Sequence, residues 1–415
     1  MMSKYLIKLG QNSKKAHKII DTKIKNNVLK SFVKLIFKNK NKILLENLKD
    51  IRFAKKKGLK KNLVNRLELN NEKLNSIIEA IKTVIKLKDP VNYELSKWTR
   101  PNGLKIKKVS IPIGVIGVIY ESRPNVTADV STLCFKSGNC VILRGGSEAY
   151  FTNKILANYF RTSLAQHKID KNFVQFIEKK DRKLVDFMLS KMSQYIDVVI
   201  PRGGKNLVKK VQELSNVAVI GHLEGICHTY IDKDANLNMA KKIVKNAKMR
   251  NTSICGATET LLIHKKKLKN INEILEELTK NGCKIYGDKT IKKNFSGKTL
   301  IANNKTWSTE HLSSKISVKV VQNILEAIEH INKYGTMHTD AIITNNNRTA
   351  KYFIKNVNSS IAIQNSSTQF ADGGEFGFGG EVGISTNKLP PRGPVGLNQL
   401  VSYKYEIYGS GQIRK

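Results

Sequence analysis

Between residues 113 and 201 short apolar runs alternate with amphipathic segments, and this rhythm constrains the fold more than any other feature. The run IGVIGVIY (113–120) is followed by a helical pattern at 126–138 and then by the apolar run NCVILRG (139–145). The alternation continues with a helical pattern at 147–164, a strand-type run at 172–178, a helical pattern at 181–192 and a strand-type run at 196–201. Buried strands joined by helices predict a parallel sheet with helices on both faces.

A second set of α/β units follows from about residue 228. The expected strands are ETLLIH (259–264), KVVQN (319–323), DAIITN (340–345) and SSIAIQN (359–365), and the expected helices are 236–249, 271–282 and 325–335. The first 90 residues read as helical, with clear three/four spacing of apolar residues over 66–86 until Asp89-Pro90. The chain is therefore expected to form two α/β domains.

Two segments fit neither domain. Residues 91–112 alternate polar and apolar positions around Pro101-Asn102-Gly103, which predicts a hairpin. The tail, 386–415, is rich in Pro and Gly and ends in the alternating stretch VSYKYEIYG (401–409). A solitary exposed edge strand is a liability, so we expect this strand to pair, with a partner subunit as one candidate.

The net charge of +40, from 73 basic and 33 acidic residues, raises the question of a nucleic-acid partner. The excess is mostly lysine and accompanies abundant isoleucine and asparagine, which points to A/T-rich codons. Arginine clusters and aromatics interleaved with basic residues are missing, so we expect no nucleic-acid partner.

The sequence also bears on compartment and metals. No apolar run is long enough to span a bilayer, and residues 1–45 lack the uninterrupted apolar centre of a signal peptide, so we expect a cytoplasmic protein without a membrane partner. The five cysteines form neither a disulfide framework nor CxxC zinc spacing, so no metal is expected.

Cys255, in TSICGATET (252–260), is either a residue that packs in the core or a nucleophile. Buried free cysteines are usually inert, as we expect for Cys134 and Cys140 inside apolar patterns. Cys255 differs because it adjoins glycine where a loop enters a strand. Lys248 and Arg250 lie just upstream and can lower a thiol pKa. The residues alone leave both readings open.

Two turns are candidates for nucleotide phosphate. No GxGxxG motif follows the first strand, but LRGGSEA (143–149) and IPRGG (200–204) each place small residues after a strand and before a helix. Backbone approaches phosphate closely at such turns, and Arg144 and Arg202 add positive charge.

Longer motifs indicate a family. The segment 113–149 closely resembles the core signature of the gamma-glutamyl phosphate reductases, the proline-biosynthesis members of the aldehyde dehydrogenase superfamily. The resemblance continues through VVIPRGG, HLEGICHTYID, NAKMRNTSICGATETLLIH, YGTMHTDAIIT, FADGGEFGFGGEVGIST and PRGPVGLNQLVSYKY, and covers most of the chain from about residue 60.

The resemblance implies an aldehyde dehydrogenase-like α/β fold of two parallel-sheet α/β domains plus a small β-arm for oligomerisation. The implied ranges are an NADP-binding domain at 1–90 and 113–225, a catalytic domain at 226–385, and an arm at 91–112 and 386–415. A homo-oligomer, dimer or larger, is therefore expected.

The implied activity is NADPH-dependent reduction of L-glutamyl 5-phosphate to L-glutamate 5-semialdehyde with release of phosphate, the second step of proline biosynthesis from glutamate. Cys255 falls on the superfamily nucleophile, which forms a thioester. Asn125 falls on the asparagine that completes the oxyanion hole with the backbone N–H of the cysteine. The expected partners are the small-molecule substrate and, as a candidate, glutamate 5-kinase.

NADPH is the cofactor that the resemblance favours. Arg144 stands where the superfamily has a lysine near the adenosine ribose, and Ser147 lies near a position often held by Glu in relatives that use NAD. Arginine with serine would accept a 2′-phosphate that glutamate would repel. The implied cofactor residues are Arg144, Gly145, Ser147, Gly203 and Gly204 at the phosphate side, and Glu310 at the nicotinamide ribose.

Several positions stay open. Candidate substrate anchors are the polar loop residues Glu121, Arg123, Arg250 and His338. Family members commonly carry arginine four residues before the cysteine, where this chain has Asn251, so the cation that assists Cys255 or the departing phosphate is undetermined. Glu224 stands where hydrolytic relatives keep a general base, and it is either a residual base or a polar loop residue.

Overall fold

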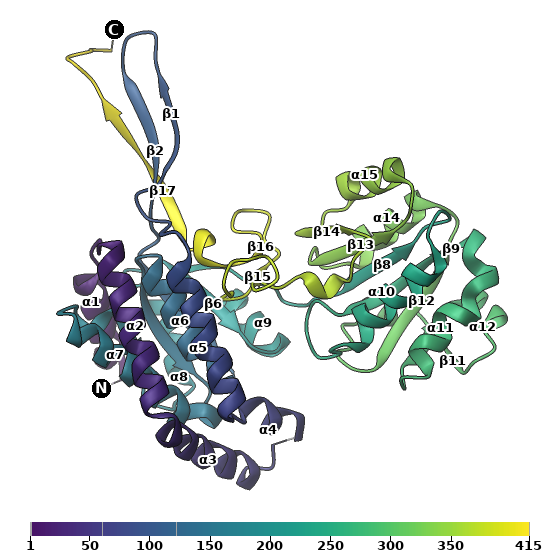
Figure 1. Ribbon diagram of the computed structural model, residues 1–415, viewed down its shortest axis with the longest axis horizontal. Coiled ribbons are helices and arrows are strands. Elements are labelled where there is room, and N and C mark those ends of the chain that lie inside the picture. The colour runs from purple at the N-terminus through teal and green to yellow at the C-terminus, as the bar shows by residue number, and fades with distance from the viewer. Residues whose placement is uncertain (1, 60, 122, 415) are drawn as a thin grey trace. The chain divides into compact units, whose positions relative to one another are not determined.

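The computed structural model describes residues 2–59, 61–121 and 123–414, which divide into two compact units (Figure 1). The first unit contains the residues through Gly221, Gly377–Gly383 and the residues from Val395 onward. The second unit contains His222–Phe376 and Ile384–Pro394. The tail from residue 386 was expected to form one segment of the arm. It is divided between the units, because its first part, to Pro394, belongs to the second unit.

The first unit is built on a five-stranded parallel sheet in the order β5-β4-β3-β6-β7. The strands are β3 (Val115–Tyr120), β4 (Cys140–Gly145), β5 (Val174–Phe176), β6 (Val198–Arg202) and β7 (Ala218–Val219). Every residue of β3 is buried, as its unbroken apolar run predicted. The parallel sheet of this region is confirmed.

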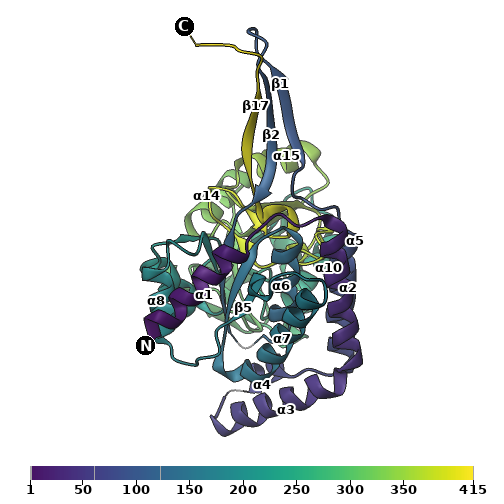
Figure 2. The same cartoon turned by 90° about the vertical axis from the view of Figure 1, so that its left-hand side faces the viewer.

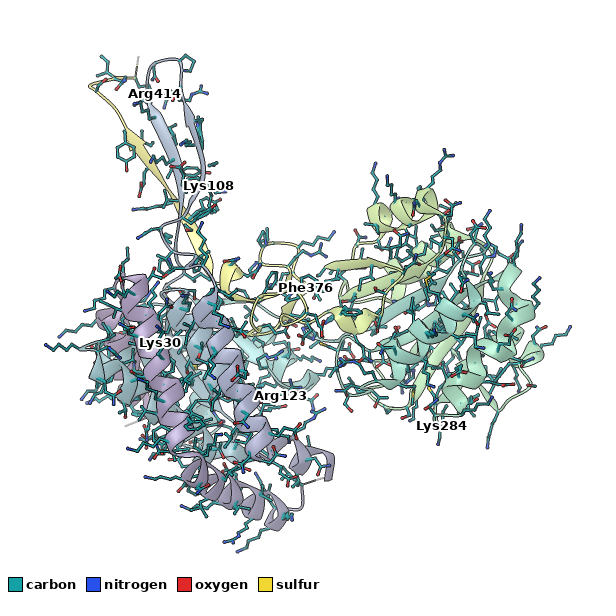
Figure 3. The ribbon with its side chains drawn as sticks, viewed as in Figure 1. Lys30, Lys108, Arg123, Lys284, Phe376 and Arg414 are labelled. Carbon is teal, nitrogen blue, oxygen red and sulfur yellow. The ribbon has the colours of Figure 1, made fainter. Side chains whose placement is uncertain are left out.

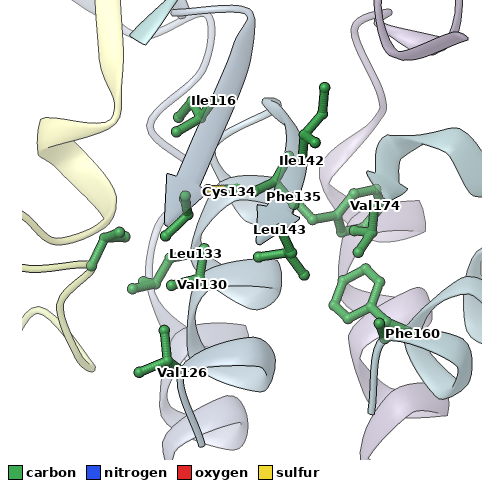
Figure 4. Close-up of a cluster of buried hydrophobic side chains, with 14 of the residues drawn as sticks. Ile116, Val126, Val130, Leu133, Cys134, Phe135, Ile142, Leu143, Phe160 and Val174 are labelled. Carbon is green, nitrogen blue, oxygen red and sulfur yellow. The ribbon is translucent and has the colours of Figure 1, made fainter. Parts of the chain in front are cut away.

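Helices pack on this sheet through one continuous apolar core. They are α6 (Asn125–Lys136), α7 (Tyr150–Gln166), α8 (Lys183–Lys191) and α9 (Lys205–Leu214). Figure 4 shows part of the core, where Ile116, Leu143 and Phe160 lie among other buried apolar side chains. Each fully buried side chain of this kind contributes about 1.5–3 kcal/mol.

The N-terminal region is helical, as predicted. It forms α1 (Met2–Ala16), α2 (Thr22–Lys38), α3 (Lys40–Lys56), α4 (Lys61–Leu67) and α5 (Asn71–Lys86), several of which appear with α6 and α7 in Figure 2. The periodic stretch 66–86 is not one helix, because Asn70 breaks it by accepting from the Lys73 N–H at 2.8 Å as an N-cap. The chain then turns at Asp89, whose carboxylate pairs at 2.9 Å with the buried ammonium of Lys25.

The predicted hairpin and the C-terminal strand form a separate three-stranded antiparallel sheet, in the order β1-β2-β17. Its strands are β1 (Glu94–Thr99), β2 (Lys105–Pro112) and β17 (Val401–Tyr408). Val401 pairs with Pro112 and Tyr408 with Lys105. The expected pairing of the tail is confirmed, and its partner is the hairpin of the same chain.

The second unit contains a seven-stranded parallel sheet in the order β11-β10-β12-β9-β8-β13-β14. Its strands are β8 (Cys227–Ile231), β9 (Thr258–His264), β10 (Lys284–Gly287), β11 (Thr299–Ile301), β12 (Lys315–Val321), β13 (Thr339–Ile343) and β14 (Ile361–Gln364). The strand expected at 319–323 begins four residues earlier, at Lys315, because the alternating residues before it pair with β10.

Helices cover both faces of the second sheet. They are α10 (Leu237–Met249), α11 (Ile271–Thr279), α12 (Lys289–Asn294), α13 (Asn304–Trp307), α14 (Ile324–Tyr334) and α15 (Asn347–Asn356). Leu261 and Ile263 of β9 belong to one apolar cluster and Leu262 to another, as the strand alternation requires. A short antiparallel pair, β15 (Ile384–Ser385) and β16 (Gly393–Pro394), completes the unit.

The lysines that dominate the net charge are spread over the molecule. Figure 3 shows Lys30 on α2, Lys108 on β2 and Lys284 on β10. This distribution agrees with the interpretation that the lysine excess reflects A/T-rich codons.

Candidate active site

Cys255 lies in the turn between α10 and β9, three residues before the strand begins. The turn is closed by the Ala257 N–H, which donates to the Ile254 carbonyl at 3.1 Å. Cys255 is half-buried, whereas all seven residues of β9 are buried. The strand thus fixes a turn whose cysteine is only partly buried.

The loop before β8 packs directly on this turn. A Cβ added at Gly225 would lie 2.3 Å from the Cys255 carbonyl oxygen and 2.7 Å from its Cβ, so only glycine fits. Cys227, at the start of β8, donates from its thiol to the same carbonyl at 3.1 Å. The loop therefore holds the backbone of Cys255 from one side.

Glu310 fixes that loop. Its Oε1 accepts from the Gly225 N–H at 2.8 Å, and the next residue, Ile226, donates to Thr336 Oγ1 at 3.0 Å. Glu310 was expected at the nicotinamide ribose, and it lies next to the segment that touches Cys255.

Two histidines accompany the cysteine. Their rings meet edge to face, with centroids 4.8 Å apart at 79°, and one ring nitrogen each from His222 and His338 lies with Cys255 Sγ in a group whose members are within 4.8 Å of one another. His222 was not singled out from the sequence, because residues 222, 255 and 338 share no spacing motif.

The sheet topology explains how these residues meet. β9, β8 and β13 are neighbouring parallel strands. Cys255 precedes β9, the loop that begins at His222 precedes β8, and His338 precedes β13. The candidate site therefore lies at the amino ends of three adjacent strands.

Lys248, one of the two cations expected to act on Cys255, is committed to another partner. It is fully buried and pairs with Glu259 Oε2 at 2.6 Å. Burial raises the pKa of Glu259 to about 7, although the Lys248 charge opposes the rise. Glu259 also accepts from the Leu312 N–H at 3.0 Å, which ties β9 to the loop that carries Glu310.

Arg250, the other expected cation, has its Nε–H donating to Gln369 Oε1 at 2.9 Å. The Gln369 amide in turn donates to the Ala247 carbonyl at 2.8 Å, at the end of α10. Asn251, which replaces the common arginine, accepts from the Ser253 N–H at 3.1 Å. These contacts fix the segment between the end of α10 and Cys255.

In the first unit, Asn125 is exposed at the first residue of α6, and its Nδ2 donates to Asp129 Oδ2 at 2.9 Å. Burial raises the pKa of Asp129 to about 6, against the opposing effects of the Asn125 hydrogen bond and the Arg202 charge. Arg123 lies half-buried two residues before Asn125, and its carbonyl accepts from the Val126 N–H (Figure 3).

Glu121, expected as a candidate substrate anchor, instead contacts the predicted pyrophosphate turn at 200–204. Its Oε2 accepts from the Gly204 N–H at 2.8 Å at the start of α9, and a Cβ on Gly203 would lie 2.7 Å from its carboxyl carbon. A helix N-terminus stabilises such a carboxylate. The structure thus places Glu121 with Gly203 and Gly204.

The residues expected at the adenosine side gather at the end of β4. Arg144 is 8% exposed and donates through Nη1 to the Gly145 carbonyl at 2.5 Å and through Nη2 to the Lys180 carbonyl at 3.2 Å. Ser147 donates to Glu148 Oε1 at 3.1 Å. The Arg144 guanidinium thus binds the backbone carbonyl groups of Gly145 and Lys180.

Near the end of β4 the exposed positive charges come from lysines. Lys57 pairs with Glu148 at 3.3 Å, and the Lys180 ammonium lies 4.5 Å from the centroid of the Tyr150 ring. Sequence reasoning missed both lysines, which were two among many in a lysine-rich chain.

Among the described residues, no helix is long and apolar enough to cross a membrane.

Comparison with known proteins identifies the family. The family model described as Aldehyde dehydrogenase family matches residues 36–297 and 260–388. A gamma-glutamyl phosphate reductase of Paramagnetospirillum magneticum is 43% identical over 98% of this chain and 96% of its own. One from Caldanaerobacter subterraneus is 46% identical over 96% of each. The crystal structure of gamma-glutamyl phosphate reductase from Thermotoga maritima superimposes with a TM-score of 0.95 and 39% identity, over 99% of this chain and 100% of that one.

The fold and these matches thus define an oxidoreductase with the aldehyde dehydrogenase fold. The chain belongs to the aldehyde dehydrogenase family and, within it, to the gamma-glutamyl phosphate reductases, also called glutamate-5-semialdehyde dehydrogenases.

Proposed function

We propose that the protein reduces L-glutamyl 5-phosphate to L-glutamate 5-semialdehyde with NADPH, releases phosphate, and so catalyses the second step of proline biosynthesis from glutamate. The observation that carries the proposal is the half-buried Cys255 in a turn that Gly225 and β9 hold in place. The family membership supports the same chemistry.

Cys255 is the proposed nucleophile. Its thiolate attacks the acyl carbon, phosphate leaves with the electron pair of the broken C–O bond, and a thioester remains. NADPH, when bound, supplies the hydride that reduces the thioester carbon. The resulting thiohemiacetal collapses to the aldehyde and frees the thiolate of Cys255. No water has to be activated in this route, so Glu224 is proposed as a polar loop residue.

Asn125 is the proposed side-chain donor to the oxyanion that forms during acyl transfer, together with the backbone N–H of Cys255. Its amide lies exposed at the start of α6, and the bond to Asp129 orients it. Removal of one such donor costs about 2.7–4 kcal/mol of transition-state stabilisation.

We propose that the first unit binds a nicotinamide dinucleotide with a 2′-phosphate. Gly145 ends β4 where a Cβ would lie 2.3 Å from Asn153 Nδ2, and Gly203 and Gly204 lie at the start of α9. We propose that Arg144 and Ser147 lie by the 2′-phosphate. Arg144 acts partly by holding the backbone of Lys180, whose ammonium adds positive charge.

At the other end of the cofactor, Glu310 is proposed to hold the nicotinamide ribose. Its bond to Gly225 keeps it beside the Cys255 turn, where the hydride is needed. The proposed substrate anchors are Arg123 and Arg250 for anionic groups, with Glu121 and His338 as further candidates.

We further propose a cytoplasmic homo-oligomer with glutamate 5-kinase as a candidate partner. Support for assembly comes from the β1-β2-β17 sheet, which exposes large apolar side chains. Those of Leu95, Tyr405 and Ile407 are 49%, 54% and 61% exposed.

The reverse reaction tests the proposal. Glutamate semialdehyde and NADP are supplied with phosphate, with arsenate, or with neither anion. We expect NADPH formation to require phosphate or arsenate. A rate independent of either anion, with glutamate as product, would instead assign a hydrolytic aldehyde dehydrogenase.

A further inference from the structure

Lys248 and Glu259 lie on either side of the Cys255 turn and close its base. Lys248 is in the last turn of α10, Glu259 is the second residue of β9, and Cys255 comes between them in the chain. The Lys248 ammonium lies 2.6 Å from Glu259 Oε2, and both side chains are fully buried. The segment that carries the proposed nucleophile is therefore tied together where it leaves the helix and enters the strand.

The other oxygen of the same carboxylate binds a second loop. Glu259 Oε1 accepts from the Leu312 N–H at 3.0 Å. The backbone of Leu312 has a φ of +47°, which is uncommon for a residue with a side chain, and Leu312 is 41% exposed. A backbone of this kind persists where its surroundings hold it. Since burial does not hold Leu312, the hydrogen bond to Glu259 is a contact that fixes it.

The second loop returns to the cysteine turn through Glu310. Only one residue separates Glu310 from Leu312 in the chain. Glu310 Oε1 accepts from the Gly225 N–H at 2.8 Å. A Cβ on Gly225 would lie 2.3 Å from the Cys255 carbonyl oxygen, so these two residues are in close contact. The contacts that begin at the Glu259 carboxylate thus return to the turn that Glu259 itself helps to close.

Lys248 favours the charged form of this carboxylate. Burial raises the pKa of Glu259, and the charge of the nearby Glu310 raises it further, whereas the Lys248 charge lowers it. A charged carboxylate makes hydrogen bonds about twice as strong as those of a neutral acceptor. Lys248 therefore strengthens the bond between Glu259 and the Leu312 N–H.

We propose that Glu259, paired with Lys248, is a positioning residue that sets Glu310 relative to the Cys255 turn. The inference rests on the proposed function, in which Glu310 holds the nicotinamide ribose and Cys255 carries the acyl group. Hydride transfer requires both in register, and a displacement of about 1 Å costs about 100-fold in rate. Glu259 is fully buried, so it acts through the loop that contains Leu312.

Two double variants separate positioning from folding. Removal of one member of a buried ion pair leaves an uncompensated charge, whereas replacement of both by apolar residues is often tolerated. Lys248→Met with Glu259→Leu removes both charges and also the acceptor of the Leu312 N–H. Lys248→Met with Glu259→Gln removes the same charges but keeps an amide oxygen for that N–H. The two variants therefore differ in this acceptor alone.

The first turnover in the reverse direction measures the hydride step. Glutamate semialdehyde and NADP are mixed with the full-length protein in a phosphate-free buffer, and NADPH absorbance is followed. The Cys255 thiolate adds to the aldehyde carbon, hydride passes to NADP, and a thioester remains, so one NADPH forms per reactive cysteine. We expect the Glu259→Leu double variant to be about 100-fold slower than the unmutated protein. The Glu259→Gln double variant should stay within about fivefold of it.

Two controls accompany these variants. Alkylation of Cys255 by iodoacetamide should proceed at equal rates in both double variants, because they share the same loss of the ion pair. Lys245→Met with Glu277→Leu removes an exposed pair, 3.2 Å apart, between α10 and α11. Exposed pairs contribute little, so the first turnover of this variant should match that of the unmutated protein.

Amide hydrogen exchange follows the contacts without the reaction. The Leu312 and Gly225 amides should be protected in the unmutated protein, since each donates to a glutamate carboxylate. Both should exchange about tenfold or more faster in the Glu259→Leu double variant and stay protected in the Glu259→Gln double variant. Faster exchange at Gly225, which binds Glu310 and not Glu259, marks transmission through the loop.

Equal first-turnover rates in the two double variants would overturn the proposal. Rapid exchange of the Leu312 amide in the unmutated protein would overturn it as well, even if neither double variant folds. If the unmutated protein forms no NADPH, the proposed function fails, and the exchange at Gly225 still decides whether Glu259 sets the position of Glu310.

Discussion

Gly225 lies so close to Cys255 that a Cβ on the glycine would fall 2.3 Å from the cysteine carbonyl oxygen. A side chain there must push the turn that carries Cys255, the proposed nucleophile. We therefore expect Gly225→Ala to lower kcat/KM about 100-fold, since displacing a reacting group by about 1 Å has this order of effect.

Gly221→Ala is the control for that substitution. A Cβ at Gly221 would meet Pro201 at 3.4 Å, an ordinary contact, so activity and thermal stability should stay near those of the unmutated protein. Steady-state kinetics of both variants decide the matter. A Gly225→Ala enzyme within about twofold of full activity would show that the contact does not position Cys255.

Cofactor preference should depend on the cluster at the end of β4. Arg144→Ala and Lys180→Ala should each raise the KM for NADPH about tenfold or more and leave NADH nearly unaffected, because a charge-assisted hydrogen bond contributes about 1.5–3 kcal/mol. Lys179→Ala is the matched control, since its ammonium lies 4.9 Å from the centroid of the Tyr5 ring. Equal efficiency with NADPH and NADH in the unmutated enzyme would refute the claim.

How far the sequence could predict this molecule depended on the kind of signal. β3 and β4 were predictable because their runs are wholly apolar. β10 and β11 were not, because they are short and carry exposed residues such as Lys284 and Ile301.

The candidate site was likewise predictable only in part. Cys255 was singled out as the candidate nucleophile because of the glycine beside it and the family resemblance of its motif. The meeting of His222 with His338 was not predictable, because it follows from the pairing of β8 with β13, and strand order is set by long-range packing.

Acid should destabilise the second unit through His330. Burial, with a smaller effect of neighbouring positive charge, lowers the pKa of His330 from 6.5 to about 2. The unfolded chain therefore binds a proton as the pH falls through 6.5, while the folded chain does not. The stability that the neutral ring provides is present above pH 6.5 and lost below it. The loss should be about 1.4 kcal/mol at about pH 5.5.

Denaturant unfolding of the unmutated protein and His330→Phe at about pH 7.5 and about pH 5.5 measures this effect. Phenylalanine keeps a ring against Trp307 and Tyr334 but cannot bind the proton. On acidification the unmutated protein should lose about 1.4 kcal/mol more of its unfolding free energy than the variant loses. An unchanged difference would mean that His330 also binds its proton in the folded state.

Removal of residues 400–415 should yield monomer or aggregate with lost activity. The deletion takes away β17 and leaves the edge of β2 unpaired. Light scattering on a sizing column, with Ile407→Lys as a milder variant that keeps the strand, gives the oligomeric state. An active full-length monomer at micromolar concentration would show that the sheet only pairs within its own chain.

The most direct measurement for the central claim is capture of the acyl-enzyme. Glutamate semialdehyde and NADP are mixed with the protein without phosphate, and the peptides are analysed by mass spectrometry, with Cys255→Ser alongside. We expect a γ-glutamyl thioester on the peptide of Cys255, released by phosphate or hydroxylamine, and neither adduct nor more than about a few per cent of activity in the serine variant, because an unactivated hydroxyl is a weak nucleophile. An adduct on another cysteine, or full turnover by Cys255→Ser, would contradict the account.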